Sequence, residues 1–202
     1  MLNIYLARHG QNEDNANGIL NGHRDMPLTA LGVEQAQNLA IKIKTAGIKF
    51  AAIYSSPLQR VYKTAEIITK ELNTVKPEIM PELIERDFGI MTGKNVSEIE
   101  KMCAPDIIKS GPIIYFLSPD DAETFPQLLE RAKIVLEIIR NKYSDGNILL
   151  VTSGDIGKMI YAAYYNLDWK AVLQEFYFGN TDMLILSKER GNLKQYVFSN
   201  KQ

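Results

Sequence analysis

The sequence predicts an α/β fold with a mainly parallel central sheet. Strand-like and helix-like segments alternate along the chain, as they do in stacked βα units. Residues 148–151 are apolar at every position, which is typical of a central strand covered on both faces. The 202 residues contain no repeat, low-complexity tract or linker. We therefore expect residues 1–202 to form a single domain.

The first half of the chain predicts strands that alternate with helices. Apolar residues recur at helical spacing from residue 36 to residue 43. Ser56 followed by Pro57 indicates an N-cap and the first turn of a helix. In order, we expect a strand over 2–7, the helix around 36–43, a strand over 51–54, a helix from Ser56-Pro57 to about residue 72, and a short strand near Ile79.

The second half continues the alternation and ends in a hairpin. Ser97 with Glu100 predicts a capping box that opens a short helix. In order, we then expect an amphipathic helix over 128–139, the strand over 148–151, a helix over about 155–165, and strands over 183–187 and 195–198 joined by a Gly191-Asn192 turn. The stretch 102–123 holds three prolines and no clean period, so we expect a small irregular lid, inserted over the functional site.

Composition and charge argue against several classes of protein. The formal net charge of -1 disfavours a surface that binds nucleic acid or adsorbs to a membrane. The single Cys103 rules out an internal disulfide and a cysteine-based zinc site. No window approaches the length of a membrane span, and the start lacks the pattern of a signal peptide, so we expect a cytoplasmic protein. The oligomeric state is not fixed by the sequence, and a homodimer stays open.

Chemically active residues follow the predicted strands. In open α/β sheets, ligands collect beyond the carboxyl ends of the strands. The residues expected at this edge are Arg8-His9-Gly10, Arg60, Glu85 and Thr152-Ser153-Gly154, the last group leading into a helix N-terminus. Two arginines, a histidine, a carboxyl group and a helix N-terminus together predict a phosphate site with a reactive group beside it.

Each of these residue types has a role in phosphoryl transfer. Arg8 and Arg60 can donate bidentate hydrogen bonds to the negative charge that spreads in the transition state, and Asn15 can add a neutral donor. His9 can attack phosphorus only with a free ring nitrogen, and neighbouring arginines favour its neutral form. Gly10 would let a backbone carbonyl approach and fix the tautomer of the imidazole. Glu85, if protonated, can give a proton to the departing oxygen.

These segments resemble those of the histidine phosphatase (phosphoglycerate mutase-like) superfamily. In chain order, the resemblance is carried by LARHGQNEDN, NGHRDMPLTALGVEQA, YSSPLQRVYKTAE, ELIERDFGIMTG, AETFPQLLERAKIVLEII and NILLVTSGDIGKMI. It implies a three-layer αβα sandwich in which His9 is phosphorylated and Glu85 is the general acid. It also implies that the phosphoryl group is bound by Arg8, Asn15, Arg60 and Gly154. No metal and no organic cofactor is implied, because the histidine itself carries the phosphoryl group.

The sequence departs from the family at two positions. Ser153 stands where the family has its second catalytic histidine, and the chain contains only His9 and His23. Serine can donate a hydrogen bond but carries no positive charge, so we expect low activity. The serine could be engineered to trap a ligand, could be natural with reduced activity, or could mark a natural pseudoenzyme; all three stay open. Asn12 stands where the family often has a hydroxyl residue, and we expect it to alter the phosphate contacts slightly.

The sequence favours a phosphatase over a mutase. Phosphoglycerate mutases usually carry paired arginines in the insertion, and KSGPIIYFLSPDDAE has none. We therefore expect a phosphomonoesterase of the phosphatase branch, which acts on a small phosphorylated metabolite and releases inorganic phosphate. His23 and Arg24 are candidate substrate contacts, with a surface position as the alternative for His23. Mutase-type phosphoryl transfer and a non-catalytic protein that binds phosphorylated ligands stay open as alternatives.

Overall fold

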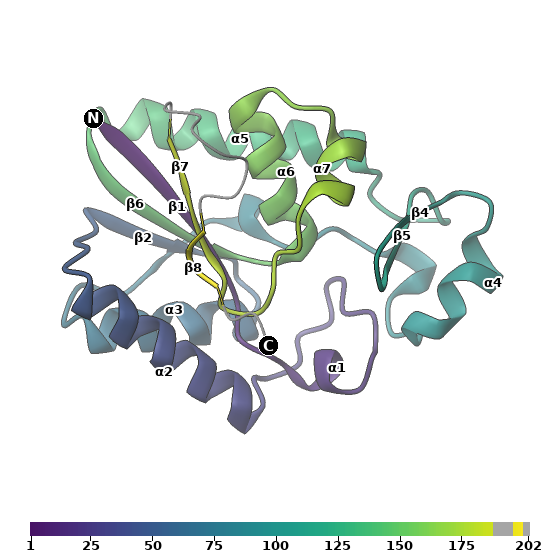
Figure 1. The fold of residues 1–202 in the computed structure, drawn as a ribbon, viewed down its shortest axis with the longest axis horizontal. Coiled ribbons are helices and arrows are strands. Elements are labelled where there is room, and N and C mark those ends of the chain that lie inside the picture. Colours follow the sequence, from purple (N-terminus) through teal and green to yellow (C-terminus); the bar gives the residue numbers. More distant parts are fainter. Residues whose placement is uncertain (188–195, 200–202) are drawn as a thin grey trace.

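The central layer of the protein is a six-stranded sheet with helices on both faces (Figure 1). The computed structural model describes residues 1–187 and 196–199, without the side chain of Tyr196. In spatial order the strands are β3 (Glu78–Ile79), β2 (Ala52–Ser55), β6 (Gly146–Thr152), β1 (Leu2–Arg8), β7 (Met183–Leu186) and β8 (Tyr196–Phe198). The pairs from β3 to β1 are parallel, whereas β7 is antiparallel to β1 and to β8. The prediction of an α/β fold with a mainly parallel sheet is confirmed.

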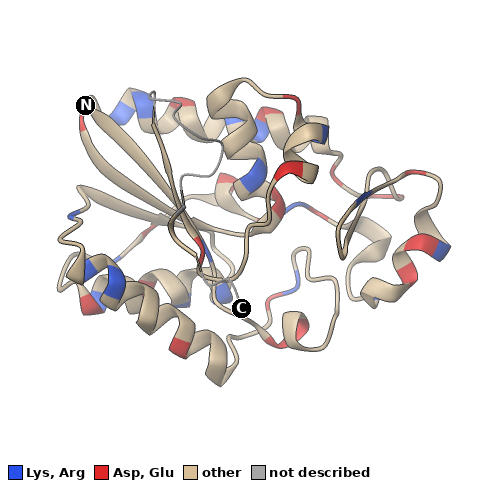
Figure 2. Ribbon diagram, viewed as in Figure 1, with Lys and Arg blue, Asp and Glu red and all other residues tan. Residues whose placement is uncertain are grey.

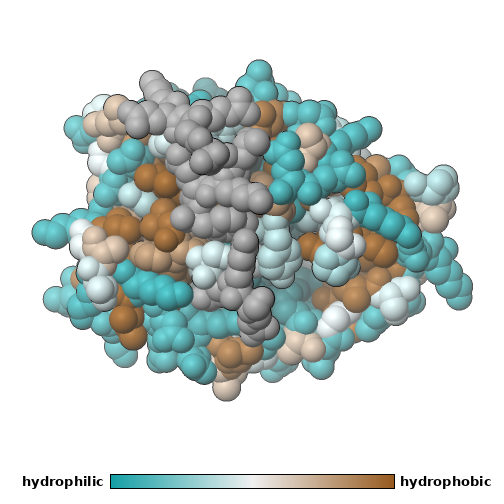
Figure 3. Space-filling model, in the orientation of Figure 1, coloured by the Kyte–Doolittle hydropathy of each residue, from teal (hydrophilic) through white to brown (hydrophobic). Residues whose placement is uncertain are grey.

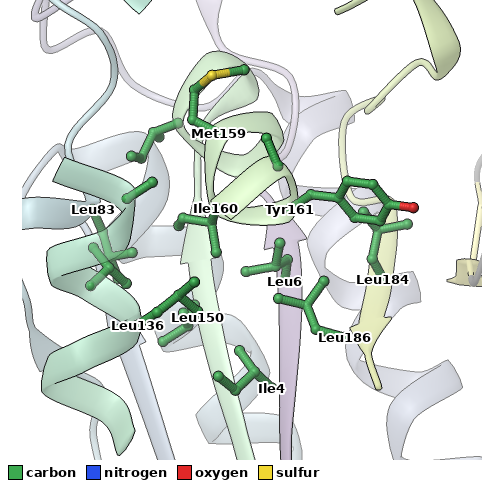
Figure 4. Packing of buried hydrophobic residues seen from close by; sticks show 14 of the residues in the cluster. Ile4, Leu6, Leu83, Leu136, Leu150, Met159, Ile160, Tyr161, Leu184 and Leu186 are labelled. Atoms are coloured by element: carbon green, nitrogen blue, oxygen red, sulfur yellow. The ribbon is translucent and has the colours of Figure 1, made fainter. Parts of the chain in front are cut away.

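Two layers of helices cover the sheet because its strands are apolar on both faces. The helices α2 (Ala30–Thr45) and α3 (Gln59–Glu71) cover one face, and α5 (Phe125–Lys142), α6 (Gly154–Tyr165) and α7 (Trp169–Glu175) cover the other (Figure 1). Along β1, Ile4 and Leu6 face α5 and α6, whereas Tyr5 and Ala7 face α2 and α3. Figure 4 shows Ile4 and Leu6 among the side chains of α5, α6 and β7. Burying one such leucine contributes about 1.5–3 kcal/mol.

The strand register brings the carboxyl ends of the parallel strands to one edge. Arg8 at the end of β1 is paired with Thr152 at the end of β6, and Ser55 at the end of β2 is paired with Val151. The residues that follow these strands therefore lie beside one another. A four-residue helix, α1 (Glu13–Ala16), follows β1 at this edge.

The segment 102–123 is more regular than its sequence predicts. It contains the antiparallel strands β4 (Ile107–Ser110) and β5 (Ile113–Phe116), which follow α4 (Ile99–Cys103) at one side of the molecule (Figure 1). The prolines lie before β4, in the turn and after β5, so they delimit the strands rather than interrupt them. Three short 3₁₀ helices, Pro81–Leu83, Gly89–Met91 and Val96–Glu98, link β3 to α4.

Two predicted helix caps are wrong. Helix α3 begins at Gln59 rather than beside Ser56, because the Ser56 hydroxyl accepts a hydrogen bond from the N–H of Leu58 and so stabilises a turn. The capping box lies at Asn95 and Glu98, two residues before the predicted pair, because asparagine is as good an N-cap as serine.

The pairing of the C-terminal strands agrees with the sequence prediction. Strands β7 and β8 pair antiparallel as predicted, and the predicted Gly191-Asn192 turn lies outside the described residues. Basic and acidic positions are interspersed along α5, whereas α2 has one acidic position near its start and two basic positions near its end (Figure 2). Within 1–187 and 196–199, no helix combines the length and the apolar character needed to cross a membrane.

Candidate active site

His9 is held at the carboxyl end of β1 with one ring nitrogen free of hydrogen. Its backbone N–H donates to the carbonyl of Thr152 at 3.0 Å. Ring atom Nδ1 lies 2.7 Å from the carbonyl oxygen of Gly10. Because a carbonyl only accepts hydrogen bonds, Nδ1 carries the hydrogen and Nε2 is left with a lone pair. The Nε–H group of Arg60 donates to this Nε2 at 3.4 Å.

The surroundings of His9 favour its neutral form. The side chain is buried, with 2% of its surface exposed. Burial, followed by the positive charges of Arg60 and Arg8, holds the pKa of His9 well below its usual value, and the hydrogen bond to Gly10 opposes this only in part. At neutral pH, His9 is therefore an uncharged imidazole with an available nucleophilic nitrogen.

Arg60 is oriented by backbone carbonyls of the loop that precedes α2. Its Nη1 donates to the carbonyl of Arg24 at 2.6 Å, and its Nη2 donates to the carbonyl of Gly22 at 3.0 Å. The residue is fully buried in the first turn of α3. Since these carbonyls carry no full charge, the positive charge of Arg60 stays available to an anion next to His9.

Two buried polar atoms at the site lack hydrogen-bond partners. Arg8 donates from Nη1 to the carbonyl of Phe178 at 2.7 Å, but its Nε finds no partner among the described residues. The Oγ of Ser153, which is fully buried, is equally unpartnered within that part of the chain. An unsatisfied buried polar group costs about 1–3 kcal/mol. Of the two residues, only Arg8 lines the cleft described below.

Glu85, rather than Ser153, caps α6. Ser153 occupies the N-cap position, but its side chain makes no capping hydrogen bond. The carboxylate of Glu85 instead accepts from the N–H groups of Asp155 at 3.4 Å and Ile156 at 3.2 Å, and also from the N–H of Arg86 at 2.9 Å. The hydroxyl of Ser153 is therefore not needed to begin the helix.

Burial favours the protonated form of Glu85, which is the form that can donate a proton. Burial, with the negative charge of Asp155 as a smaller cause, raises the pKa of Glu85, although the N–H groups of Arg86 and Ile156 and the charge of Arg60 oppose the shift. Two of the three N–H groups reach Oε1, so the proton belongs on Oε2. A Cβ atom added to Gly154 would lie 3.8 Å from this Oε2 and 3.7 Å from Cζ of Arg8. Gly154 thus marks the space between the two side chains.

Six of the predicted residues converge on one cleft, whereas Ser153 is fully buried and is not among the described residues that line it. The volume of the cleft is about 260 Å³, and the six candidates that line it are Arg8, His9, Asn15, Arg60, Glu85 and Gly154. The amide oxygen of Asn15 accepts from Asn180 Nδ2 at 3.3 Å, which directs the NH₂ group of Asn15 the other way. Asn180 also donates to the carbonyl of His9 at 2.9 Å. Asn15 can therefore act as a donor in the cleft.

Three other candidates lie outside the cleft lining, although His23 and Asn12 contact residues that line it. His23 contacts the backbone carbonyl of Glu85 through Nε2 at 2.8 Å, and Arg24 pairs with Asp14 at 2.8 Å. Asn12 caps α1 and donates to Asn21 at 2.6 Å. None of the three lines the cleft in the described part of the chain. His23 contacts the backbone of Glu85, the backbone carbonyl of Arg24 accepts from Arg60, and Asn12 contacts Asn21, which lines the cleft.

Gly10 and Gly32 allow a very close backbone contact at the start of α2. A Cβ atom on Gly10 would lie 2.3 Å from the carbonyl oxygen of Gly32, and one on Gly32 would lie 1.9 Å from the carbonyl oxygen of Gln11. Both distances are shorter than any real Cβ contact. The loop that carries His9 is therefore pressed against α2 in a way that only glycine permits.

Sequence reasoning missed several residues of the cleft. Arg86 and Asp155 form a buried ion pair of 2.9 Å beside Glu85, and each is adjacent in sequence to a predicted site residue. Lys158 and Tyr115 form a buried hydrogen bond of 2.6 Å in the same cleft. The Lys158 signal was its position one turn after Gly154 on a helix that begins at the site. Tyr115 lies in the segment predicted as a lid.

Comparison with known proteins agrees with this geometry. The family model described as "Histidine phosphatase superfamily (branch 1)" matches residues 4–200. The chain belongs to this superfamily. Its members catalyse phosphoryl chemistry as phosphatases or mutases, which indicates an enzyme. The three-layer sandwich expected from the resemblance is the fold observed.

Relatives within the histidine phosphatase superfamily include both kinds of enzyme. The chain is 32% identical over 123 residues to a 2,3-bisphosphoglycerate-dependent phosphoglycerate mutase of Bartonella tribocorum, a match that spans 60% of each chain. It is 30% identical over 165 residues to phosphoglycerate mutase-like protein 4 of Arabidopsis thaliana, covering 78% of this chain and 69% of that protein. The phosphoserine phosphatase of Entamoeba histolytica, solved with 3-phosphoglyceric acid, superposes with a TM-score of 0.74 at 25% identity, covering 92% of this chain and 90% of that one.

Proposed function

We propose that the protein is a phosphomonoesterase that acts on a small phosphorylated metabolite through a phosphohistidine at His9. The observation that carries the proposal is the state of His9. The imidazole is neutral at pH 7. Its Nε2 has no hydrogen and lies 3.4 Å from Nε of Arg60. An imidazole nitrogen that carries no hydrogen is suited to attack phosphorus once the weak contact from Arg60 passes to a phosphoryl oxygen.

The reaction has two balanced steps. In the first, the Nε2 lone pair of His9 forms a bond to phosphorus as the bond from phosphorus to the ester oxygen breaks, and Glu85 gives its proton to that oxygen. In the second, water attacks the phosphohistidine, the nitrogen–phosphorus bond breaks, and Glu85 takes a proton from the water. Inorganic phosphate leaves, and His9 and Glu85 return to their starting states. Arg8 and Arg60 stabilise the charge on the phosphoryl oxygens in both steps.

We further propose that Ser153 occupies the place of a second catalytic histidine and lowers turnover. Its hydroxyl has no partner within the described residues, and the next residue, Gly154, lines the cleft. Serine supplies no positive charge. Losing one preorganised donor of this kind costs about 2.7–4 kcal/mol, or roughly 10²–10³ in rate.

Hydrolysis of a generic aryl phosphate tests the proposal. The protein and Ser153→His are assayed side by side, with His9→Ala as the blank. We expect slow turnover by the protein, faster turnover by Ser153→His by about 10²-fold or more, and none by His9→Ala. Equal and high activity of the first two would contradict the role given to residue 153. If neither is active while phosphate still raises the melting temperature, the protein binds phosphorylated ligands without turning them over.

Phosphoglycerate mutase activity is the second candidate, because the curated relatives named above are mutases or mutase-like. A mutase returns the phosphoryl group to its product, whereas a phosphatase passes it to water. Incubation of Ser153→His with 3-phosphoglycerate separates the two reactions. Release of inorganic phosphate supports the phosphatase, and formation of 2-phosphoglycerate without phosphate release supports the mutase.

A further inference from the structure

Beyond the phosphate site, the cleft is lined mainly by apolar side chains. They come from separate parts of the chain, among them Leu20 before α2, Phe88 and Val96 before α4, Ile113 and Phe116 on β5, and Phe178 after α7. Figure 3 shows hydrophobic residues gathered on the right of this face, in the region that Figure 1 assigns to the β4–β5 hairpin. The cationic end of the cleft therefore continues into an apolar one.

We propose that the preferred substrate is a phosphomonoester of an uncharged, apolar alcohol, rather than of a carboxylic acid. This inference rests on the proposed function and specifies its substrate class. The phosphoryl group lies at Arg8 and Arg60, and the alcohol portion lies against the apolar walls. Burial of apolar surface there stabilises the complex by about 25 cal/mol per Å².

Besides Arg8 and Arg60, the described residues that line the cleft include two cations. The first, Arg86, is already paired within the protein. Its side chain is buried and paired with Asp155 at 2.9 Å, and its Nη1 donates to the carbonyl of Glu123 at 3.2 Å. Its guanidinium lies over the rings of Phe88, Phe116 and Phe125 at 4.9, 4.3 and 4.4 Å from their centroids. A substrate carboxylate would have to displace Asp155 to pair with Arg86.

The second cation, Lys158, also has its partners within the protein. Its ammonium group donates to the hydroxyl of Tyr115 at 2.6 Å and to the carbonyl of Leu173 at 3.2 Å. Burial lowers the pKa of Lys158 to about 8, which the charge of Asp155 opposes. Its hydrogen bond to Tyr115 joins α6 to β5. A carboxylate placed against Ile113 or Leu20 would lose its water without gaining a free cation.

The size of the cleft is consistent with this class of substrate. The cleft has a volume of about 260 Å³, which is small for a ligand pocket. Pockets for drug-sized molecules measure roughly 300–1,000 Å³. The cleft therefore suits a phosphoryl group with one short chain or one ring.

A series of alkyl phosphates tests the inference without changing the reactivity of the ester. Methyl, butyl and hexyl phosphate are compared with glycerol 1-phosphate and 3-phosphoglycerate, using the protein and Ser153→His. We expect kcat/KM to rise by about fourfold for each added methylene group, which corresponds to ~0.8 kcal/mol of burial per group. Hexyl phosphate should then exceed both polar esters. A flat series, or a preference for 3-phosphoglycerate, overturns the inference and leaves the proposed function standing.

Two matched variants locate the effect. Val96 lines the cleft and is 46% exposed, whereas Val75 is 73% exposed and lies outside it. Val96→Lys should lower the preference for hexyl phosphate over 3-phosphoglycerate by about tenfold or more, a change of ~1.4 kcal/mol. Val75→Lys should leave the preference unchanged. Equal effects of the two variants would contradict the placement of the alcohol portion beside Val96.

Ligand-induced shifts of the melting temperature separate this inference from the proposed function. If no ester is hydrolysed but longer alkyl phosphates stabilise the protein more than 3-phosphoglycerate does, the phosphatase proposal fails and the apolar preference of the site holds. If no ester is hydrolysed and chain length has no effect on the melting temperature, both fail.

Discussion

The hydroxyl of Thr64 accepts a hydrogen bond of 3.1 Å from the backbone N–H of Gly10. This contact joins the middle of α3 to the loop that follows β1. The same hydroxyl donates to the carbonyl of Arg60 at 2.8 Å, one turn earlier in α3. One buried threonine therefore links the peptide that fixes the His9 tautomer to the helical turn that carries Arg60.

Replacement of Thr64 by valine should lower activity more than its effect on stability explains. The Gly10 N–H would lose its partner, which costs about 1–3 kcal/mol for a buried donor. We expect kcat/KM to fall at least about tenfold as His9 shifts relative to Arg60. Thr69→Val is the matched control, because Thr69 is also buried in α3 and bonds only the carbonyl of Glu66 among the described contacts. Equal activity losses in the two variants would contradict the link.

Replacement of Ser153 by alanine should not destabilise the ligand-free protein. The Ser153 hydroxyl is buried without a partner in the described structure, so its removal relieves about 1–3 kcal/mol of unfavourable desolvation. We expect the melting temperature to rise, and the further increase produced by phosphate to become smaller. Ser55→Ala serves as the control, since that buried hydroxyl donates to the carbonyl of Ser56 at 2.8 Å. A similar loss of stability in both variants would show that Ser153 has a structural partner.

Replacement of Glu85 by glutamine should change how stability depends on pH. The folded-state pKa of Glu85 is raised by burial and by Asp155, so folding favours the protonated carboxyl. That contribution is complete below the unfolded pKa of about 4.3 and is lost as pH rises through the raised folded value. Glutamine cannot ionise, so we expect Glu85→Gln to melt at a higher temperature than the parent at pH 8 and to show little difference at pH 4.

The control and the activity of this variant distinguish two roles of Glu85. Exposed Glu137→Gln should show no such dependence on pH. Glu85→Gln should keep phosphate binding, because the amide oxygen can still accept from Arg86 and Ile156. It should lose about 10²-fold or more in the hydrolysis of alkyl phosphates, since the proton donor is gone. Full activity of Glu85→Gln would exclude it as the general acid.

Replacement of Arg60 by lysine should remove activity although the charge is kept. The guanidinium donates to His9, to Gly22 and to Arg24 in three directions, which one ammonium group cannot reproduce. We expect at least about 10²-fold lower kcat/KM. We also expect vanadate to raise the melting temperature of the variant less than that of the parent. Arg140→Lys, at the surface of α5 beside Tyr164, should be neutral. Retained activity in Arg60→Lys would mean that charge alone is sufficient at this position.

Much of the fold was predictable because its signals are local. The apolar run at 148–151 identified β6, and the position of Arg8 and Ser153 directly after strands predicted that they meet at one edge. The caps at Ser56 and Ser97 were not predictable, since several polar residues near each helix start can cap it and tertiary contacts decide between them. The lid was wrongly predicted to be irregular because proline positions mark strand ends as readily as irregular chain, although its β5 residues line the cleft as expected of a lid.

The site was predictable only in its directly acting residues. A motif identifies a nucleophile or a phosphate ligand, but not the groups that orient them through the fold. Thr64, Asn180 and Asp155 lie far in sequence from the atoms they hold, and their hydrogen bonds depend on how α3, α6 and the segment after α7 pack. The role of Glu85 as the cap of α6 was hidden for the same reason, because Ser153 occupies the position at which a sequence reading expects the cap.

The contact between Gly10 and Gly32 determines which part of this protein can be exchanged with a relative. Each glycine leaves room for the backbone of the other segment, so a side chain at either position would collide with the chain opposite. A chimera that takes only the residues around His9 from a relative places a foreign loop against the α2 backbone of this protein. The smallest segment that carries both halves of the contact is 10–32, and recombination within it should yield proteins that fail to fold rather than enzymes with altered specificity.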